Sequence, residues 1–185
     1  KIYRAAEGRD EVLSTVTVDK GGRLAWLPQD TILYERSALS RGLDVDLAVD
    51  AEALIVEAVI VGRKAHGETV RHAVLRDRWR VRMAGRLVHA EELALGADMA
   101  GQLSARAGAG GGSAFATVLL IAGEAEALLA AARDIVGDEG GASFWRVGGT
   151  GKLLARLVAE DGYTLRQRLV PLLGLLNRGA ELPKL

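Results

Sequence analysis

Three phrases in the first half of the chain decide the fold: WLPQDTILYE at residues 26–35, EAVIVGRKAHGE at residues 57–68 and RDRWRV at residues 76–81. Each phrase carries apolar residues at strand spacing, interrupted by a turn-forming proline or glycine or by charged residues. The sequence contains no complete catalytic motif. From the residues alone we therefore predict a mostly-β interaction domain.

The strands around these phrases differ in how many of their faces are buried. In residues 43–50, Leu43, Val45, Leu47 and Val49 share one face while Asp44, Asp46 and Asp50 fall on the other, which predicts a strand with one solvated face. Residues 54–61 are apolar on both faces except for Glu57, so we predict that this strand is buried on both sides.

A hairpin is predicted further along the chain. Residues 68–83 are expected to form one long strand that turns through Ala84-Gly85 into residues 86–93. With Met83 opposite Arg86, the register predicts two cross-strand pairs: Arg78–Glu91, which is favourable, and Asp77–Glu92, which is not.

The composition divides the chain into three parts within a mainly β (α+β) fold. We predict a β-rich body at residues 1–104, a Gly/Ala-rich connection at residues 105–114 and an α+β unit at residues 115–185. The last unit reads as β-α-β-β-α, with helices at residues 124–136 and 164–177.

Charge and cysteine content limit the partners and the compartment. The 24 basic and 24 acidic residues cancel, so we expect neither nucleic acid nor a membrane surface as a partner. The chain has no cysteine, which is compatible with a reducing compartment, and we predict a cytoplasmic protein. Because the chain does not begin with Met, we expect part of the native N-terminus to be missing.

Glu57 is the first candidate functional residue. A carboxylate with apolar neighbours on both strand faces must be paired, protonated or reached by internal water. Arg63, Glu68 and Arg71 are close enough in sequence to help. A structural salt bridge and a polar conduit lined by Glu57 and Glu68 both fit this pattern.

Arginines and a proline-containing bend supply the candidate partner-binding residues. One face of the long strand carries four arginines, which suit an acidic partner surface: Arg76, Arg78, Arg80 and Arg82. The Trp26-Leu27-Pro28 bend predicts a sheet edge with Asp30 exposed beside it. A solvated strand face and a core tryptophan are the simpler explanations.

Other motifs argue against common chemistries. Residues 148–152 lack the first glycine and the hydroxyl residue of a phosphate-binding loop, so a glycine-rich turn is the better interpretation. His66, His72 and His89 have no spacing that would place two imidazoles on one helical face, so we do not expect them to form a tight metal site.

Taken together, the phrases resemble the UreD (UreH) urease accessory protein family. The resemblance runs along most of the chain and rests on Lys1-Ile2-Tyr3-Arg4, residues 26–32, residues 57–68, Asp77-Arg78-Trp79-Arg80 and the leucine-rich C-terminal helix. It implies a β-rich body of helically stacked sheets with two helices near the C-terminus and no catalytic activity.

The resemblance also implies a process and partners. Members of the family assemble with UreF, and through UreF with the GTPase UreG, on the urease apoprotein, and help to deliver nickel. No tightly bound cofactor is expected, and nickel is expected only as an ion in transit. Our hypothesis is that Glu57, Glu68 and Asp77 line a polar passage, with Arg63 among the partner-binding residues.

Two alternatives come from other functional classes. A β-rich hydrolase would use Glu57 with Glu68 or Asp77 as an acid/base pair, and it requires an aromatic substrate cleft. A passive adaptor would hold the same partners together and conduct nothing.

Overall fold

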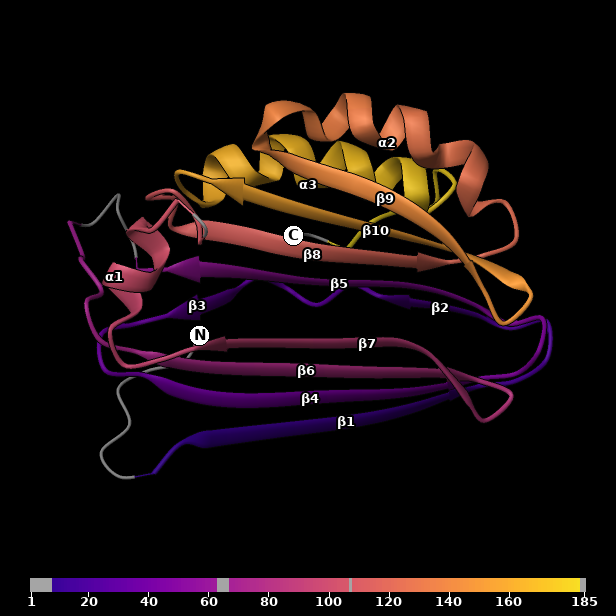
Figure 1. Ribbon diagram of the computed structural model, residues 1–185, viewed down its shortest axis with the longest axis horizontal. Coiled ribbons are helices and arrows are strands. Elements are labelled where there is room, and N and C mark those ends of the chain that lie inside the picture. The colour runs from indigo at the N-terminus through magenta and orange to yellow at the C-terminus, as the bar shows by residue number, and fades with distance from the viewer. Residues whose placement is uncertain (1–7, 63–66, 107, 184–185) are drawn as a thin grey trace.

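Two β-sheets packed face to face form the body, and two helices cover the outer face of the larger sheet (Figure 1). This computed structural model describes residues 8–62, 67–106 and 108–183. The prediction of a mainly β fold built from stacked sheets is confirmed. Among the described residues, no helix is long and apolar enough to cross a membrane.

The smaller sheet has four strands in the order β1-β4-β6-β7. These strands are β1 (Asp10–Val18), β4 (Ala38–Leu47), β6 (Val74–Met83) and β7 (Arg86–Leu95). The larger sheet has six strands in the order β2-β5-β8-β10-β9, with β3 also paired to β5. Its strands are β2 (Arg23–Trp26), β3 (Thr31–Leu33), β5 (Glu52–Val61), β8 (Ala114–Ile121), β9 (Gly140–Val147) and β10 (Thr150–Ala159).

The first part of the chain winds between the sheets. Strand β1 lies in the four-stranded sheet, β2 and β3 in the six-stranded sheet, β4 in the first again, β5 in the second and β6 in the first. Because the chain returns to each sheet in the same direction, β1, β4 and β6 pair in parallel, and so do β2 and β3 with β5. Each turn of the chain therefore stacks on the previous one.

The boundaries predicted for β4 and β6 are wrong. Strand β4 ends at Leu47 rather than at residue 50, because Ala48 N–H donates to the carbonyl of Val18 and the chain then turns, leaving Val49 73% exposed. Strand β6 begins at Val74 rather than at residue 68. The backbone just before it is engaged elsewhere, since the carboxylate of Glu35 accepts from two of its N–H groups.

The hairpin between β6 and β7 is confirmed, but only part of its register is. Ala84 and Gly85 both have positive φ, 48° and 77°, and Met83 pairs with Arg86. A β-bulge then shifts the pairing between Val81 and Arg82. As a result Arg78 lies opposite Glu92 and Asp77 opposite Leu93, so both predicted cross-strand pairs are wrong.

The C-terminal part confirms the predicted order β-α-β-β-α. Its helices are α2 (Leu129–Val136), which follows the 3₁₀ turn η2 (Ala125–Leu128), and α3 (Gly162–Leu176); a second 3₁₀ turn, η3 (Gly137–Glu139), precedes β9. Residues 148 and 149 form the turn between β9 and β10. Strand β8 pairs with β5, so one sheet spans the predicted connection, and the division of the chain into a β-rich body, a connection and an α+β unit stays a prediction.

The predicted connection contains more order than its composition suggests. The short helix α1 (Met99–Ser104) precedes it and was not predicted; Asp98 caps its first turn by accepting from Gly101 N–H. Hydrogen-bonded turns follow, for example from Gly111 N–H to the carbonyl of Leu103.

Three apolar clusters make up the core. One fills the layer between the six-stranded sheet and the helices, where Leu54, Val56 and Leu172 are fully buried or nearly so. The other two lie between the sheets, one around Trp79 and the other around Leu75. The boundary between these last two clusters defines the candidate site.

Candidate functional site

A charged residue interrupts the apolar inner face of three strands at the same level. On β4 it is Arg41, on β5 Glu57 and on β6 Asp77. On each strand, the inward residues before and after it belong to different apolar clusters. These three residues, which we call the charged layer, therefore divide the inter-sheet core in two.

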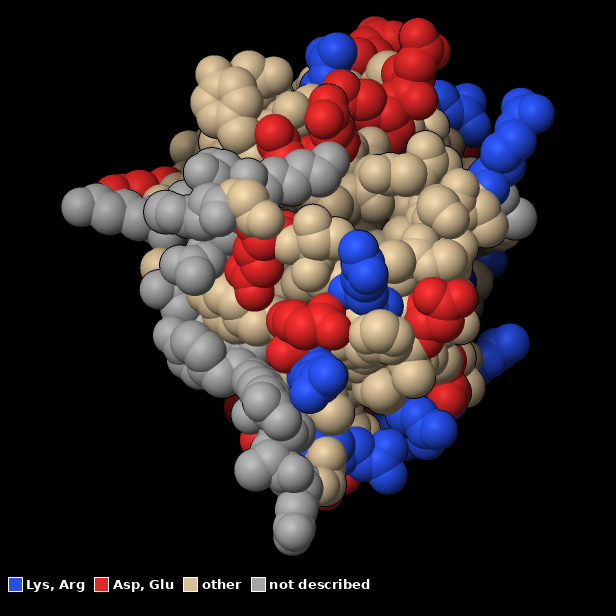
Figure 2. Space-filling model, turned by 90° about the vertical axis from the view of Figure 1, so that its left-hand side faces the viewer, with Lys and Arg blue, Asp and Glu red and all other residues tan. Residues whose placement is uncertain are grey.

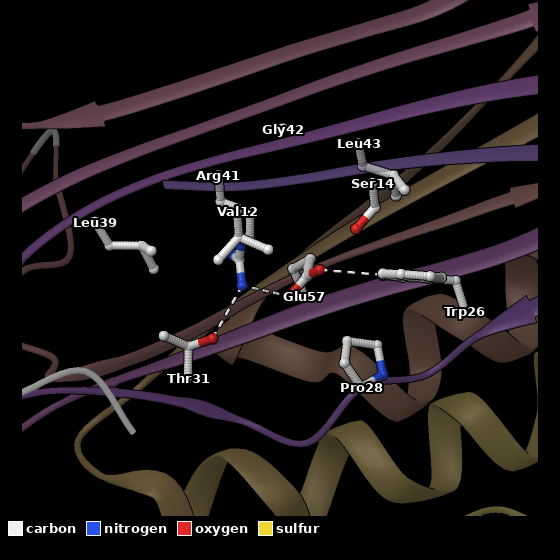
Figure 3. Close-up of a pocket in the computed structure, with 10 residues that line it drawn as sticks. All are labelled: Val12, Ser14, Trp26, Pro28, Thr31, Leu39, Arg41, Gly42, Leu43 and Glu57. Atoms are coloured by element: carbon white, nitrogen blue, oxygen red, sulfur yellow. Dashed lines mark hydrogen bonds and ion pairs between the residues drawn. The ribbon is translucent and has the colours of Figure 1, made fainter. Parts of the chain in front are cut away.

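Arg41 joins the two carboxylates of the charged layer. Its Nη1 lies 2.5 Å from Glu57 Oε2 (Figure 3). Its Nη2 lies 2.5 Å from Asp77 Oδ2. Nη1 also donates to Thr31 Oγ1 on β3 at 2.9 Å. The guanidinium thus bridges the two sheets through charge-assisted hydrogen bonds.

Two tryptophans extend this network at both ends. Trp26 Nε1 donates to Glu57 Oε1 at 3.1 Å, and Trp79 Nε1 donates to Asp77 Oδ1 at 3.1 Å. Trp26 comes from β2 and Trp79 from β6, so each carboxylate is held by Arg41 on one oxygen and by an indole on the other.

Burial sets the protonation of the charged layer. The side chains of Arg41 and Glu57 are only 10% and 6% exposed. Burial raises the pKa of Glu57 to about 7, although the Arg41 cation and the Trp26 N–H both act to lower it. Asp77, as a second nearby carboxylate, raises that pKa further. Burial therefore favours the protonated form of Glu57 much more than that of an exposed carboxyl group.

A cavity of about 190 Å³ opens beside Glu57 and Arg41. Figure 3 shows its lining, which comes from both sheets: Val12 and Ser14 of β1, Trp26, Pro28, Thr31, Leu39, Gly42 and Leu43 in addition to the two charged residues. We call it the edge cavity because β1 is the outermost strand of its sheet. It places open space directly beside Arg41 and Glu57 of the charged layer.

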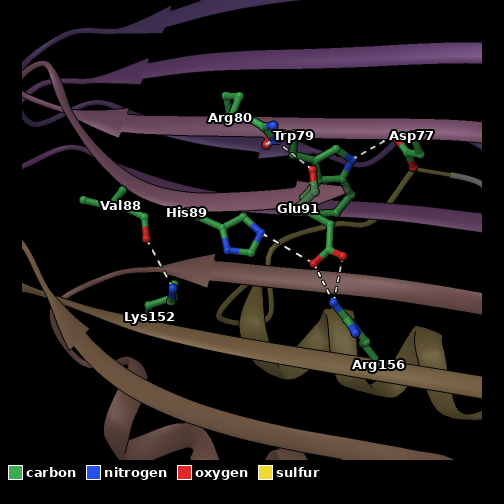
Figure 4. Close-up of polar contacts among 8 residues, drawn as sticks. All are labelled: Asp77, Trp79, Arg80, Val88, His89, Glu91, Lys152 and Arg156. Atoms are coloured by element: carbon green, nitrogen blue, oxygen red, sulfur yellow. Dashed lines mark hydrogen bonds and ion pairs between the residues drawn. The ribbon is translucent and has the colours of Figure 1, made fainter. Parts of the chain in front are cut away.

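A second polar group continues from Trp79 towards the opposite margin of the sheets (Figure 4). The ring of His89 on β7 lies 6.2 Å from that of Trp79, and its Nε2 lies 3.9 Å from Glu91. Glu91 in turn accepts two hydrogen bonds from Arg156 at 2.7 Å. Lys152 donates to the carbonyl of Val88. We call these residues the β7 cluster.

The bulge in the hairpin creates the β7 cluster. It pairs His89 with Val81 and Glu91 with Trp79, and therefore turns both side chains inward. Burial lowers the pKa of His89 to about 4, with the Lys152 cation as the next cause, so the imidazole is neutral at pH 7. A second cavity of about 370 Å³ lies against Glu91 and Arg156 and is otherwise lined mainly by apolar residues.

The structure brings together two of the three predicted passage residues. Glu57 and Asp77 share Arg41, whereas the backbone of Glu68 lies beside Gly62, just past the end of β5. Gly62 lies five residues beyond Glu57 along an extended strand, which places the two residues about 16 Å apart. Arg41 and Trp26 hold Glu57, and neither was among the residues named as close enough in sequence to help it; of those, Arg63 lies outside the described residues.

The alternation predicted for the arginine row is confirmed. Arg76, Arg78, Arg80 and Arg82 lie on the solvated face of β6, opposite the buried face of Leu75, Trp79, Val81 and Met83. Within the part of the chain that the structure describes, ion pairs join Arg78 and Arg82 to Asp44 and Arg80 to Glu92. In Figure 2, which views one end of the molecule, acidic side chains gather at the top and basic ones at the bottom right.

Of the other predicted partner-binding residues, the three that the structure describes, Trp26, Pro28 and Asp30, lie in different positions from those expected. Asp30 is not exposed: its side chain is 4% exposed and pairs with Arg166 of α3. Trp26 and Pro28 line the edge cavity rather than an outer rim. Arg63 lies outside the described residues.

The sequence left Arg41, His89 and Glu91 unrecognised as site residues. Arg41 lies two residues from both Leu39 and Leu43. Its side chain therefore points to the same inward face as theirs, once the strand is known to start at Ala38. In the sequence, the only signal for the β7 bulge is that the inward apolar residues change from an even position, Val88, to an odd one, Leu93. Among the described residues, no group of three or more His, Cys, Asp or Glu is arranged to hold a metal ion.

Comparison with known proteins identifies the class. The family model described as "UreD urease accessory protein" matches residues 1–184, which makes this chain a urease accessory protein by class. It is 57% identical over 185 residues to the urease accessory protein UreD of Mesorhizobium japonicum. It is 56% identical over 188 residues to UreD 1 of Brucella anthropi and 53% identical over 184 residues to UreD 1 of Brucella abortus.

The chain belongs to the UreD family. Each of these comparisons covers 100% of this chain but 66% of the relative. The chain thus spans slightly less than two thirds of the length of the curated relatives that it matches.

Proposed function

We propose that this chain works in urease maturation, as the UreD component of a cytoplasmic complex that prepares the urease apoprotein. In this proposal it binds UreF, and through UreF the GTPase UreG, and helps nickel to reach the urease active site. Family membership along the whole chain supports the process, and the charged layer is the observation that supports a role in moving the metal.

The charged layer suits a cation in transit. One guanidinium faces two carboxyl groups, so the layer carries a net negative charge when both are ionised. A divalent cation that enters from the edge cavity can compete with Arg41 for Glu57 and Asp77. Oxygen ligands hold nickel weakly compared with a closed imidazole or thiolate site, which lets the ion move on.

The same contacts weigh against the hydrolase alternative. A glycosidase-type mechanism requires one carboxyl group to donate a proton and the other to attack or to activate water. Here one Arg41 side chain holds both Glu57 and Asp77. The carboxylates are thus paired structurally, and we propose a protein that works without catalysis of its own.

The arginine row is our proposed contact for an acidic partner surface. Arg76 and Arg78 are exposed at one end of the row, on the face of the four-stranded sheet that the helices do not cover. Trp26 and Asp30 make internal contacts, so we expect them to affect assembly only through the fold.

Complementation tests the proposed function. In a urease-positive host from which the native gene for this protein is deleted, the wild-type protein restores nickel-dependent urease activity and co-purifies with UreF and the urease apoprotein. Restored urease activity without any UreD-family protein would contradict the maturation role. Normal activation by a protein whose charged layer is made apolar would favour the passive adaptor instead.

A further inference from the structure

The segment between β2 and β3 interrupts the larger sheet beside Glu57. The two strands lie end to end along β5, where β2 ends its pairing at Trp26 and β3 begins its pairing at Thr31. Residues 27–30 fill the interval and run past residues 56–58 of β5, so this segment is one residue longer than the stretch beside it. Figure 1 shows it as an undulation between the labels of the two strands. We call residues 27–30 the β5 bend.

The two residues that flank the β5 bend hold the charged layer. Trp26 Nε1 donates to Glu57 Oε1, and Thr31 Oγ1 accepts from Nη1 of Arg41 (Figure 3). Pro28 within the bend has no N–H to donate to a ladder, which suits a break in the pairing at this level. The position of the bend therefore decides whether both flanking side chains reach the charged layer.

The β5 bend is held from the other face of the larger sheet. Leu27 packs against the apolar cluster under the helices. The carboxylate of Asp30 accepts a charge-assisted hydrogen bond from Nη2 of Arg166 on α3. The Asp30 side chain is almost fully buried, whereas that of Arg166 is 40% exposed. Because a buried carboxylate needs its cation, this ion pair fixes the bend to α3.

An ion pair at this place selects one arrangement of the chain. Apolar residues of similar volume would often fasten the bend at least as strongly, and the best-attested use of a buried polar contact is to specify register. Successive side chains of an extended segment point to opposite faces, so a slip of one residue turns each of them over. Such a slip at the β5 bend would turn Trp26 and Thr31 away from the charged layer.

We propose that Arg166 is a positioning residue of the charged layer. By holding Asp30 it fixes the β5 bend, and the bend keeps Trp26 and Thr31 in contact with the buried charges. The geometry of the charged layer is thus set from the helices that cover the opposite face of the sheet. As a role in nickel delivery this inference rests on the proposed function, whereas the hydrogen bonds that it predicts do not.

The three tryptophan indoles of this sequence test the proposal in one series of NMR spectra. Trp26 and Trp79 each donate to a carboxylate of the charged layer, and Trp145 is 46% exposed. In isotope-labelled wild-type protein, the first two indole N–H groups exchange slowly with deuterated water and the third exchanges fast. Arg166→Gln speeds the exchange at Trp26 at least ~10-fold, because the bend loosens, and leaves that at Trp79 unchanged.

Two further variants separate positioning from a general loss of structure. Arg166→Lys keeps a cation at the end of the side chain and retains slow exchange at Trp26. Arg168→Gln removes the ion pair with Glu139 on the same helix and changes neither buried indole. Unchanged exchange at Trp26 in Arg166→Gln overturns the proposal. So does faster exchange at both buried indoles together, which identifies a merely structural role.

Urease activation by the same variant is measured separately. Arg166→Gln in the full-length protein co-purifies with urease as wild type does, but supports less activation at limiting nickel, because the charged layer is no longer held in place. Faster exchange at Trp26 alone, combined with normal activation, supports the positioning contact and contradicts the proposed role of the charged layer in nickel delivery. The two failures are therefore distinguishable.

Discussion

The two faces of β5 are equally buried but chemically different. Towards the helices the strand presents Leu54, Val56 and Ala58, which join a wholly apolar cluster. Towards the other sheet, Glu57 interrupts its apolar residues and meets Arg41. A hydrophobic residue in place of a buried ion pair is often as stable or more stable. The charged layer is therefore a weak source of stability compared with the apolar helix side, which fits our proposal that it serves function.

The largest effect is expected from removal of the shared cation. Arg41→Met leaves Glu57 and Asp77 buried without their partner, which costs about 3–5 kcal/mol. The free energy of unfolding, measured by urea denaturation, reports the loss. Arg76→Met on the solvated face of β6 is the matched control and stays within about 0.5 kcal/mol of wild type. Equal effects of the two substitutions would contradict the structural contrast.

A truncation on the helix side gives the reference for ordinary core packing. Leu172 of α3 is fully buried, and Leu172→Ala leaves a cavity that lowers the free energy of unfolding by about 2–5 kcal/mol. The dependence of stability on pH stays as in wild type, because no charged group loses a partner. A changed pH profile in this variant would show that the two faces of β5 are coupled.

Glu57 makes stability depend on pH in a direction that is unusual for a carboxylate. Its pKa is raised in the folded state from 4.5 to about 7, so its stabilising contribution is complete below pH 4.5 and is lost as the pH rises through 7. The full loss is up to about 3 kcal/mol. Glu57→Gln removes this decline, and unfolding curves from pH 4.5 to 8 measure it. An unchanged profile would refute the assigned pKa.

His89 acts in the opposite direction over nearly the same range. Its pKa is lowered in the folded state from 6.5 to about 4, so stability is lost as the pH falls from 6.5 towards 4. The effect partly cancels that of Glu57 in the wild-type chain. His89→Phe removes it and makes the decline due to Glu57 steeper, by roughly 1–3 kcal/mol over this range. The same pH series compares both variants with the exposed control His72→Phe.

Local pattern was enough to find Glu57 but not its partner. The apolar residues on both faces of residues 54–61 marked that strand as buried, and Ala84-Gly85 marked the hairpin. Arg41 was missed because the strand that carries it was placed from Leu43 onwards. Its contact with Glu57 also depends on how distant strands pair in parallel, which a single strand pattern does not specify.

The β7 cluster shows a second limit of sequence patterns. One extra residue in β7 reverses which side chains face inward, so the predicted Asp77–Glu92 clash never forms. Instead Asp77 binds Arg41, and Glu91 reaches Arg156. Helix and strand order in the last third was predictable because apolar spacing there is regular, whereas α1 is too short to show such a pattern.

The most direct test replaces the whole charged layer with apolar residues in the full-length protein. The variant Arg41→Met, Glu57→Leu, Asp77→Leu is assayed for urease activation at limiting nickel, together with its stability and its co-purification with UreF and urease. We predict a folded protein that is at least as stable as wild type and still assembles, but fails to support activation. Normal activation by this variant would contradict the role of the charged layer in nickel delivery.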